Sequence, residues 1–122
     1  MLPNATYRAY EYHEKDDIYR FANIRFAAPP VGPLRWQKPQ PPPAMAMEQD
    51  GSEYASCLHS MPTRFLAAKP VLSEIWQQSE DCLFLDLYIP GPVVRGYVKD
   101  VAILHWFYGG GYGMSSCWVV EG

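Results

Sequence analysis

The sequence lacks long apolar runs, strong basic charge and a leader-like start, and each absence excludes a class of protein. No apolar stretch approaches the roughly 20 residues that a membrane-spanning helix needs, so we expect no membrane span. A net charge of −3 gives no electrostatic reason to bind nucleic acid. Residues 1–4 are followed by neither a basic segment nor an apolar one, so we predict no signal peptide.

Proline and apolar residues, by contrast, are abundant. The 12 prolines among 122 residues predict turns and extended segments in place of long helices, because the usual proline share is only about 5%. An apolar fraction of 48% excludes a disordered chain. We therefore expect one domain or part of one, long enough to bury a core.

The first two thirds of the chain predict short strands joined by irregular segments. Residues 1–28 alternate aromatic and polar positions, which indicates two or three short strands in a meander. Residues 29–43 hold too many prolines for the interior of a sheet, so we expect an extended surface segment. Residues 44–81 show no sustained period and predict a long irregular loop with one helical turn at 73–78.

Two strong strand patterns follow. The stretch CLFLDLYI at 82–89 is rich in strand formers and ends at Pro90. The stretch VAILHWFY at 101–108 is almost continuously apolar, as expected for a strand covered on both faces. The intervening residues 90–100 predict a turn-rich connection.

Three consecutive glycines, Gly109 to Gly111, come directly after the second of these strand patterns. The carboxyl end of a strand in an open α/β sheet is where ligands bind. Glycine lets main-chain N–H groups approach a ligand, and two such groups can hold a phosphate or the oxyanion of an acyl intermediate. The run fits neither GxxxxGK[ST] nor GxGxxG, which disfavours phosphate. A glycine-rich turn without a ligand is the alternative that the triplet alone leaves open.

Three blocks of sequence, in this order, resemble the N-terminal part of the type-B carboxylesterases, the cholinesterase-like branch of the α/β-hydrolases. NIRFAAPPVGPLRWQKPQPP (23–42) resembles the opening strand of that family and its Pro-Pro-x-Gly-x-x-Arg-[Trp/Phe] segment. SEDCLFLDLYIP (79–90) resembles the Glu-Asp-Cys-Leu signature, and HWFYGGGYGMSS (105–116) resembles the oxyanion loop. The resemblance covers about residues 18–116. It implies that residues 1–122 form part of one carboxylesterase type-B domain.

The fold class that this resemblance implies is α/β. We expect an incomplete α/β-hydrolase fold, with an N-terminal β-meander, the first strands of the central sheet and few helices. The implied oxyanion loop consists of Tyr108, Gly109, Gly110, Gly111 and Tyr112. In it the Gly110 and Gly111 amides would donate to the developing oxyanion, and each such donor is worth roughly 3–4 kcal/mol of barrier.

The resemblance also implies two structural pairs. Cys57 and Cys82 match the first disulfide of the family, which would stabilise the chain by roughly 3–4 kcal/mol, and two free thiols are the alternative. Arg35 and Glu80 match an ion pair of the family, and two separately solvated charges are the alternative. Cys117 is left without an implied partner.

The reaction of such a family is ester hydrolysis by a serine on a Gly-x-Ser-x-Gly elbow, with a histidine base and an acid. No residue of that triad is assigned in this sequence. GMSSC at 113–117 has cysteine in place of the second glycine, and His13, His59 and His105 match no catalytic position of the family. We therefore expect no ester turnover from residues 1–122 alone, and a poorly soluble chain unless a partner completes its sheet.

Three functions remain open: an N-terminal fragment of a serine carboxylic-ester hydrolase that acts on a small ester, a non-catalytic cholinesterase-like binding or adhesion module, and a small β-rich anion-binding domain. The first is favoured. We expect no cofactor and no metal, and neither the substrate nor the oligomeric state is predicted. A glycosylation sequon at Asn4 and the Cys57/Cys82 pair favour secretion, although the start lacks a signal peptide. Trp36 and Trp76 are expected to pack against their neighbours.

Overall fold

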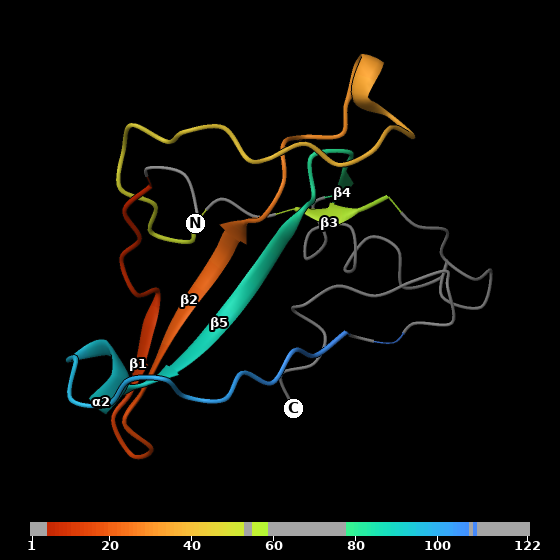
Figure 1. The fold of residues 1–122 in the computed structure, drawn as a ribbon. Coiled ribbons are helices and arrows are strands. Elements are labelled where there is room, and N and C mark those ends of the chain that lie inside the picture. Colours follow the sequence, from red (N-terminus) through yellow and green to blue (C-terminus); the bar gives the residue numbers. More distant parts are fainter. Residues whose placement is uncertain (1–4, 53–54, 59–77, 108, 110–122) are drawn as a thin grey trace, which may run out of the picture.

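The computed structural model describes residues 5–52, 55–58, 78–107 and 109, and shows two small sheets joined by extended segments (Figure 1). A three-stranded antiparallel sheet has the order β1-β2-β5, and a two-stranded parallel sheet pairs β3 with β4. The elements are β1 (Glu11–His13), β2 (Ile18–Arg25), the 3-10 helix η1 (Gly32–Leu34), β3 (Ser56–Cys57), β4 (Gln78–Ser79), β5 (Phe84–Pro90) and α2 (Gly91–Val94).

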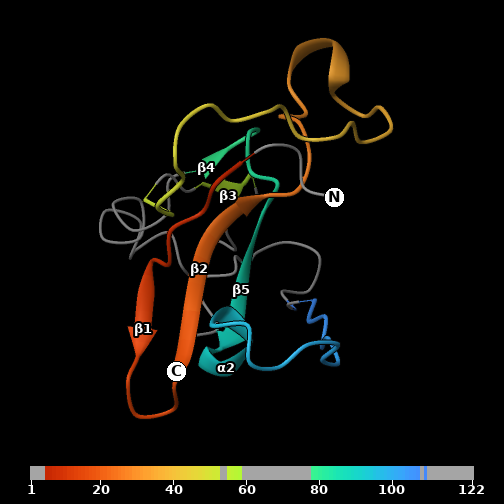
Figure 2. The same cartoon turned by 60° about the vertical axis from the view of Figure 1, so that its left-hand side comes forward.

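The three-stranded sheet is formed by the segments that the sequence patterns predicted as strands near each end of the chain. The predicted meander is the β1–β2 hairpin, in which Tyr12 lies opposite Tyr19. The predicted strand at 82–89 is β5, which runs beside β2 along its whole length (Figures 1 and 2). Pro90 is the last residue of β5 and pairs with Ile18, a position at a strand end where the missing N–H costs little.

A β-bulge interrupts the pairing of β2 with β5. Phe21 lies opposite Leu87 and Ile24 lies opposite Leu85, so two residues of β2, one of them Asn23, face the single residue Asp86. Asn23 has φ +54°, a left-handed conformation that asparagine tolerates better than most residues. The bulge therefore turns the carboxyl half of β2 relative to its first half.

The small hydrophobic core lies on this half of β2. Ala22, Ile24 and Ala27 are each no more than 3% exposed. The loop around Gly51 covers them: Gly51 has φ +78°, and a Cβ there would lie 2.9 Å from the carbonyl oxygen of Ala22. A bridge between Tyr7 and Gln49 ties the same loop to the N-terminal segment.

The proline-rich segment at 29–43 is extended and exposed, as predicted, apart from the single turn of η1. The hydrogen bond from the Ala28 N–H to the Gln40 carbonyl, at 3.0 Å, joins its two ends. The region 44–81, predicted as an irregular loop, contains the two short strands β3 and β4. The helical turn predicted at 73–78 lies outside the described residues except for Gln78, which belongs to β4.

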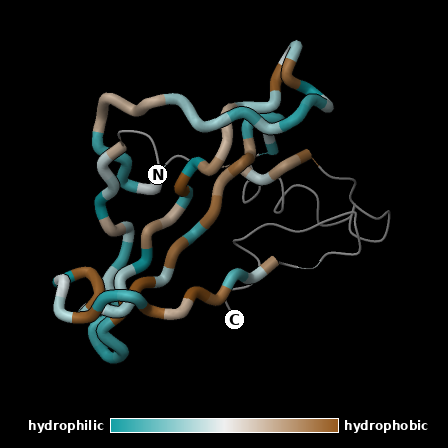
Figure 3. The backbone as a smooth tube through the Cα atoms, in the orientation of Figure 1, coloured by the Kyte–Doolittle hydropathy of each residue, from teal (hydrophilic) through white to brown (hydrophobic). Residues whose placement is uncertain are grey.

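The prediction of a buried strand at 101–108 is wrong for the residues that the structure describes. Residues 101–107 form no strand, and Ile103, Leu104 and Phe107 are 88%, 91% and 78% exposed. A buried strand needs hydrogen-bonded neighbours and cover on its faces, and within the described ranges no strand pairs with this segment. Figure 3 shows it as a partly hydrophobic stretch of the tube away from the sheet. The connection before it, predicted as turns, contains the short helix α2.

Candidate functional site

The predicted oxyanion loop lies at the edge of the described chain. Gly109 is exposed, and a Cβ at this position would meet nothing within 4 Å. Tyr108, Gly110, Gly111 and Tyr112 lie outside the described residues. The donation of hydrogen bonds by the Gly110 and Gly111 amides therefore stays a prediction.

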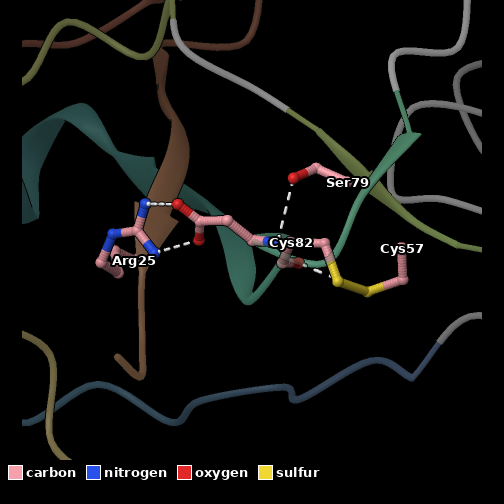
Figure 4. The surroundings of a disulfide bond; sticks show 5 residues. Arg25, Cys57, Ser79 and Cys82 are labelled. Carbon is pink, nitrogen blue, oxygen red and sulfur yellow. Dashed lines mark hydrogen bonds and ion pairs between the residues drawn. A yellow bond between two sulfur atoms is a disulfide. The ribbon is translucent and has the colours of Figure 1, made fainter. Parts of the chain in front are cut away.

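The four residues from Ser79 to Cys82, here called the 79–82 segment, connect β4 to the start of β5 and make contacts with three distant parts of the chain (Figure 4). The Asp81 N–H donates to Ser79 Oγ at 3.0 Å, which closes a local turn. This turn directs the side chains of successive residues toward different neighbours. The segment coincides with the Glu-Asp-Cys signature that the sequence analysis singled out.

A disulfide joins Cys82 to Cys57 of β3, with the two Cα atoms 4.9 Å apart. This is the pairing that the family resemblance implied, and the alternative of two free thiols is wrong. Cys57 also lies opposite Ser79 in the parallel β3–β4 pair. The disulfide therefore joins two segments that main-chain pairing already holds together.

Asp81 binds Arg25, the last residue of β2, through both carboxylate oxygens. The Arg25 Nη1 and Nη2 atoms donate to Asp81 Oδ1 and Oδ2 at 2.5 and 2.9 Å. The Arg25 side chain is only 12% exposed, and its guanidinium carbon lies 4.5 Å from the centre of the Phe84 ring. Bidentate pairs of this kind combine strength with defined geometry. The sequence analysis missed this pair, although the Asp beside the predicted disulfide was a signal that could have prompted a search.

Glu80 binds Arg35 in the proline-rich segment, with Arg35 Nε 3.0 Å from Glu80 Oε1. The two side chains are 55% and 33% exposed, so this contact is more hydrated than the Arg25–Asp81 pair. Trp36, expected to pack, is instead 90% exposed. Its segment projects from the sheet, where the described chain supplies no covering surface.

A second polar cluster, also missed, surrounds Arg20 at the bulge. Arg20 Nη2 donates to Asp86 Oδ2 at 2.9 Å, and the Asn23 main-chain N–H donates to Asp86 Oδ1 at the same distance. The guanidinium lies over the rings of Tyr10 and Tyr88, 5.6 and 5.7 Å from their centres. Arg20 is 3% exposed. The single carboxylate thus satisfies a buried cation and the irregular backbone of the bulge.

A third cluster joins the β1–β2 turn to α2. Arg95 donates two hydrogen bonds to the carboxylate of Asp17, at 3.0 and 2.5 Å, and the Tyr12 hydroxyl donates to Asp17 Oδ1 at 3.1 Å. The bonds from Arg95 hold the pKa of Asp17 below its usual value, whereas the bond to Asp17 raises the pKa of Tyr12. The Asp17 pair likewise raises the pKa of Arg95. Gly91 lies directly against Asp17, so a larger residue there would displace the pair.

The histidines have no site geometry in the described residues. His13 is exposed, with Nε2 3.5 Å from Glu11 Oε2, and the His105 ring stacks on Phe107 at 4.2 Å between centroids. His59, Trp76, Asn4 and Cys117 lie outside the described residues. Across the described ranges there is no group of three or more potential metal ligands. No helix in the described part of the chain is both long and apolar enough to cross a membrane.

Comparison with known proteins identifies the family. The sequence model of the carboxylesterase family matches residues 7–121. Fumonisin B1 esterase of Sphingopyxis macrogoltabida is 39% identical over 97 residues, which cover 79% of this chain and 16% of that protein. Acetylcholinesterase 1 of Caenorhabditis elegans is 38% identical over 98 residues, which cover 78% of this chain and 16% of that protein. The chain thus spans about a sixth of the length of these relatives.

Solved structures agree with the sequence comparison. The crystal structure of Aspergillus niger EstA superposes with a TM-score of 0.51 at 30% identity, over 70% of this chain and 14% of that one. A thermophilic PNB esterase superposes with a TM-score of 0.53 at 25% identity, over 71% and 17% of the two chains. The predicted fold class, an incomplete α/β-hydrolase fold, is confirmed. This chain therefore belongs to the carboxylesterase family.

Proposed function

We propose that residues 1–122 form the N-terminal part of a serine carboxylic-ester hydrolase that acts on small esters. The observation that carries the proposal is the family match over residues 7–121, which includes the glycine triplet and its flanking tyrosines. In this proposal the Gly110 and Gly111 amides donate hydrogen bonds to the oxyanion of the tetrahedral intermediate. Glycine is required there because a side chain would block the approach of the substrate carbonyl.

The contacts of the 79–82 segment support this proposal indirectly. They tie the Glu-Asp-Cys signature to β2, to β3 and to the proline-rich segment through Asp81, Cys82 and Glu80. Such ties hold the β2–β5 sheet in one geometry, as a site with preorganised donors needs.

The chain alone is proposed not to turn over esters, because its 122 residues contain no Gly-x-Ser-x-Gly elbow. Oxyanion donors without a nucleophile cannot form the acyl-enzyme. The test is p-nitrophenyl acetate hydrolysis by the purified chain, with a Gly110→Val variant as the matched control. We expect equal background rates for both, and activity that belongs to the chain and disappears in Gly110→Val would overturn this part of the proposal.

The coding sequence downstream of Gly122 tests the assignment to a hydrolase. We expect it to encode Gly-x-Ser-x-Gly, followed by an acid and a histidine in that order. A substituted elbow would show a non-catalytic binding module. An anion-binding domain would show sulfate-dependent NMR shifts confined to the Gly109–Gly111 amides.

We also propose that the protein folds in an oxidising compartment. The disulfide between Cys57 and Cys82 carries this proposal, because disulfides persist chiefly in secreted proteins. The sequon at Asn4 then becomes a candidate glycosylation site. Expression in a secreting eukaryotic cell should give a mass shift that N-glycosidase removes and Asn4→Gln abolishes.

A further inference from the structure

The 79–82 segment places an acidic residue, bound on both oxygens, immediately before a disulfide-bonded cysteine. Asp81 is fixed by Arg25, and Cys82 is bonded to Cys57. The position of the Cys82 main chain is thus defined independently of the disulfide. The same holds for Cys57, which lies opposite Ser79 in the β3–β4 pair.

We propose that the Arg25–Asp81 pair is a positioning device for the disulfide, and sets how resistant the Cys57–Cys82 bond is to reduction. In the reduced chain, β3–β4 pairing and the ion pair keep the two cysteines facing one another. Their effective concentration is then high, and a high effective concentration favours the closed, oxidised form. The inference does not rest on the proposed function.

The redox step that the pair influences is thiol–disulfide exchange with glutathione. The thiolate of one glutathione attacks a sulfur of the Cys57–Cys82 bond, which breaks and leaves a mixed disulfide and one protein thiol. A second glutathione thiolate then attacks the mixed disulfide. Oxidised glutathione leaves, and the chain holds two thiols. Two electrons pass from two glutathiones to the protein, and the two protons released by the glutathiones are taken up by the new thiols.

The chain supplies a matched control in the neighbouring residue. Glu80 pairs with Arg35 through a single contact between side chains that are 33% and 55% exposed. Arg25 is 12% exposed and binds Asp81 through two bonds. Both pairs hold the same segment by a carboxylate, but the Arg25–Asp81 pair is the less hydrated and the more directional. Only this pair should influence the disulfide strongly.

The experiment is a glutathione redox titration of the full chain in a Cys117→Ser background, so that only one intramolecular disulfide can form. Alkylation and mass spectrometry give the ratio of reduced to oxidised chain. Asp81→Asn should raise this ratio about tenfold at a fixed glutathione ratio, which corresponds to about 30 mV. Glu80→Gln should change it less than twofold. The double exchange Arg25→Asp with Asp81→Arg should restore the ratio to within about threefold of the parent.

Two outcomes would overturn the proposal. One is an Asp81→Asn ratio no different from that of Glu80→Gln. The other is a loss of amide-exchange protection throughout β2 and β5 in Asp81→Asn, since the pair would then stabilise the whole sheet and not the disulfide in particular. If Asp81→Asn does not fold, Arg25→Lys takes its place, because it keeps the charge but loses the bidentate geometry. That variant should raise the ratio two- to fourfold, and an unchanged ratio would equally contradict the proposal.

Discussion

Asn23 and Asp86 meet at the bulge of β2, where the Asn23 main-chain N–H donates to Asp86 Oδ1 at 2.9 Å. The second oxygen of the same carboxylate accepts a hydrogen bond from buried Arg20, also at 2.9 Å. The Asp86 side chain is 8% exposed and that of Arg20 is 3% exposed. One acid thus neutralises a buried cation and satisfies an irregular strand, and the antiparallel sheet depends on it.

Asp86→Asn is therefore expected to destabilise the fold by about 3 kcal/mol, because it leaves the buried Arg20 cation without its closest counter-charge. Chemical denaturation followed by circular dichroism measures the change. Glu11→Gln is the control, because Glu11 Oε2 is 3.9 Å from Arg20 and the Glu11 side chain is 47% exposed. It should cost less than about 0.5 kcal/mol. Equal effects of the two substitutions would contradict the role assigned to Asp86.

Two glycines with similar backbone angles should differ in their tolerance of alanine. Gly51 and Gly96 have φ +78° and +75°, but only Gly51 has a neighbour, the Ala22 carbonyl oxygen, within 4 Å of an added Cβ. Gly96→Ala should cost about 1 kcal/mol through its left-handed conformation alone. Gly51→Ala should cost at least about 2 kcal/mol more, because it also pushes the loop off the core. Thermal unfolding of both variants measures the difference, and similar melting temperatures would exclude close packing at Gly51.

Stability should fall at both acidic and alkaline pH through the Asp17 cluster. Arg95 lowers the pKa of Asp17, so its contribution is present above the unfolded value of about 3.9 and is lost as pH falls through the folded value. The bond to Asp17 raises the pKa of Tyr12, so that contribution is present below about pH 10 and is lost as pH rises through the folded value. Unfolding midpoints between pH 2 and 12 measure both limbs.

Gly91→Ala is the matched variant for this pH dependence, because its Cβ would displace Asp17 from Arg95. The carbon-13 titration of the Asp17 carboxyl should then move toward the ordinary aspartate pKa. An unchanged titration in Gly91→Ala would show that the Arg95 bonds do not determine the pKa of Asp17.

The exposed apolar segment at 101–107 should limit solubility. Leu104→Lys removes an apolar side chain that is 91% exposed, so it should reduce light scattering on concentration and change unfolding free energy by less than about 0.5 kcal/mol. Gln37→Lys makes the same charge change at an exposed polar position and serves as the control. If both variants improve solubility equally, net charge and not the apolar segment is responsible.

Local patterns were sufficient for the strands whose partners lie within the chain. The alternation in residues 1–28 and the strand formers of 82–89 predicted β1, β2 and β5, because each pairs with another of the three. The same reasoning failed at 101–107. A continuous apolar run indicates burial, but burial needs a covering surface, and the described chain provides none there.

The candidate site divides in the same way. The Glu-Asp-Cys block, read through its resemblance, predicted the disulfide of Cys57 with Cys82. It did not reveal that Asp81 reaches Arg25, because that contact depends on where β2 ends beside β5. The bulge likewise has no simple sequence pattern, since asparagine inside a strand does not by itself predict a left-handed residue.

The sequence by itself determined the family, the short strands and the extended proline-rich segment, because these follow from residue types, their spacing and motifs along the chain. Only the tertiary structure decided which charges meet. Arg20 with Asp86, Arg25 with Asp81 and Arg95 with Asp17 are each separated by more than 50 residues. Ion pairs over such separations form only after the register of β2 against β5 brings the partners together, and no local pattern encodes that register.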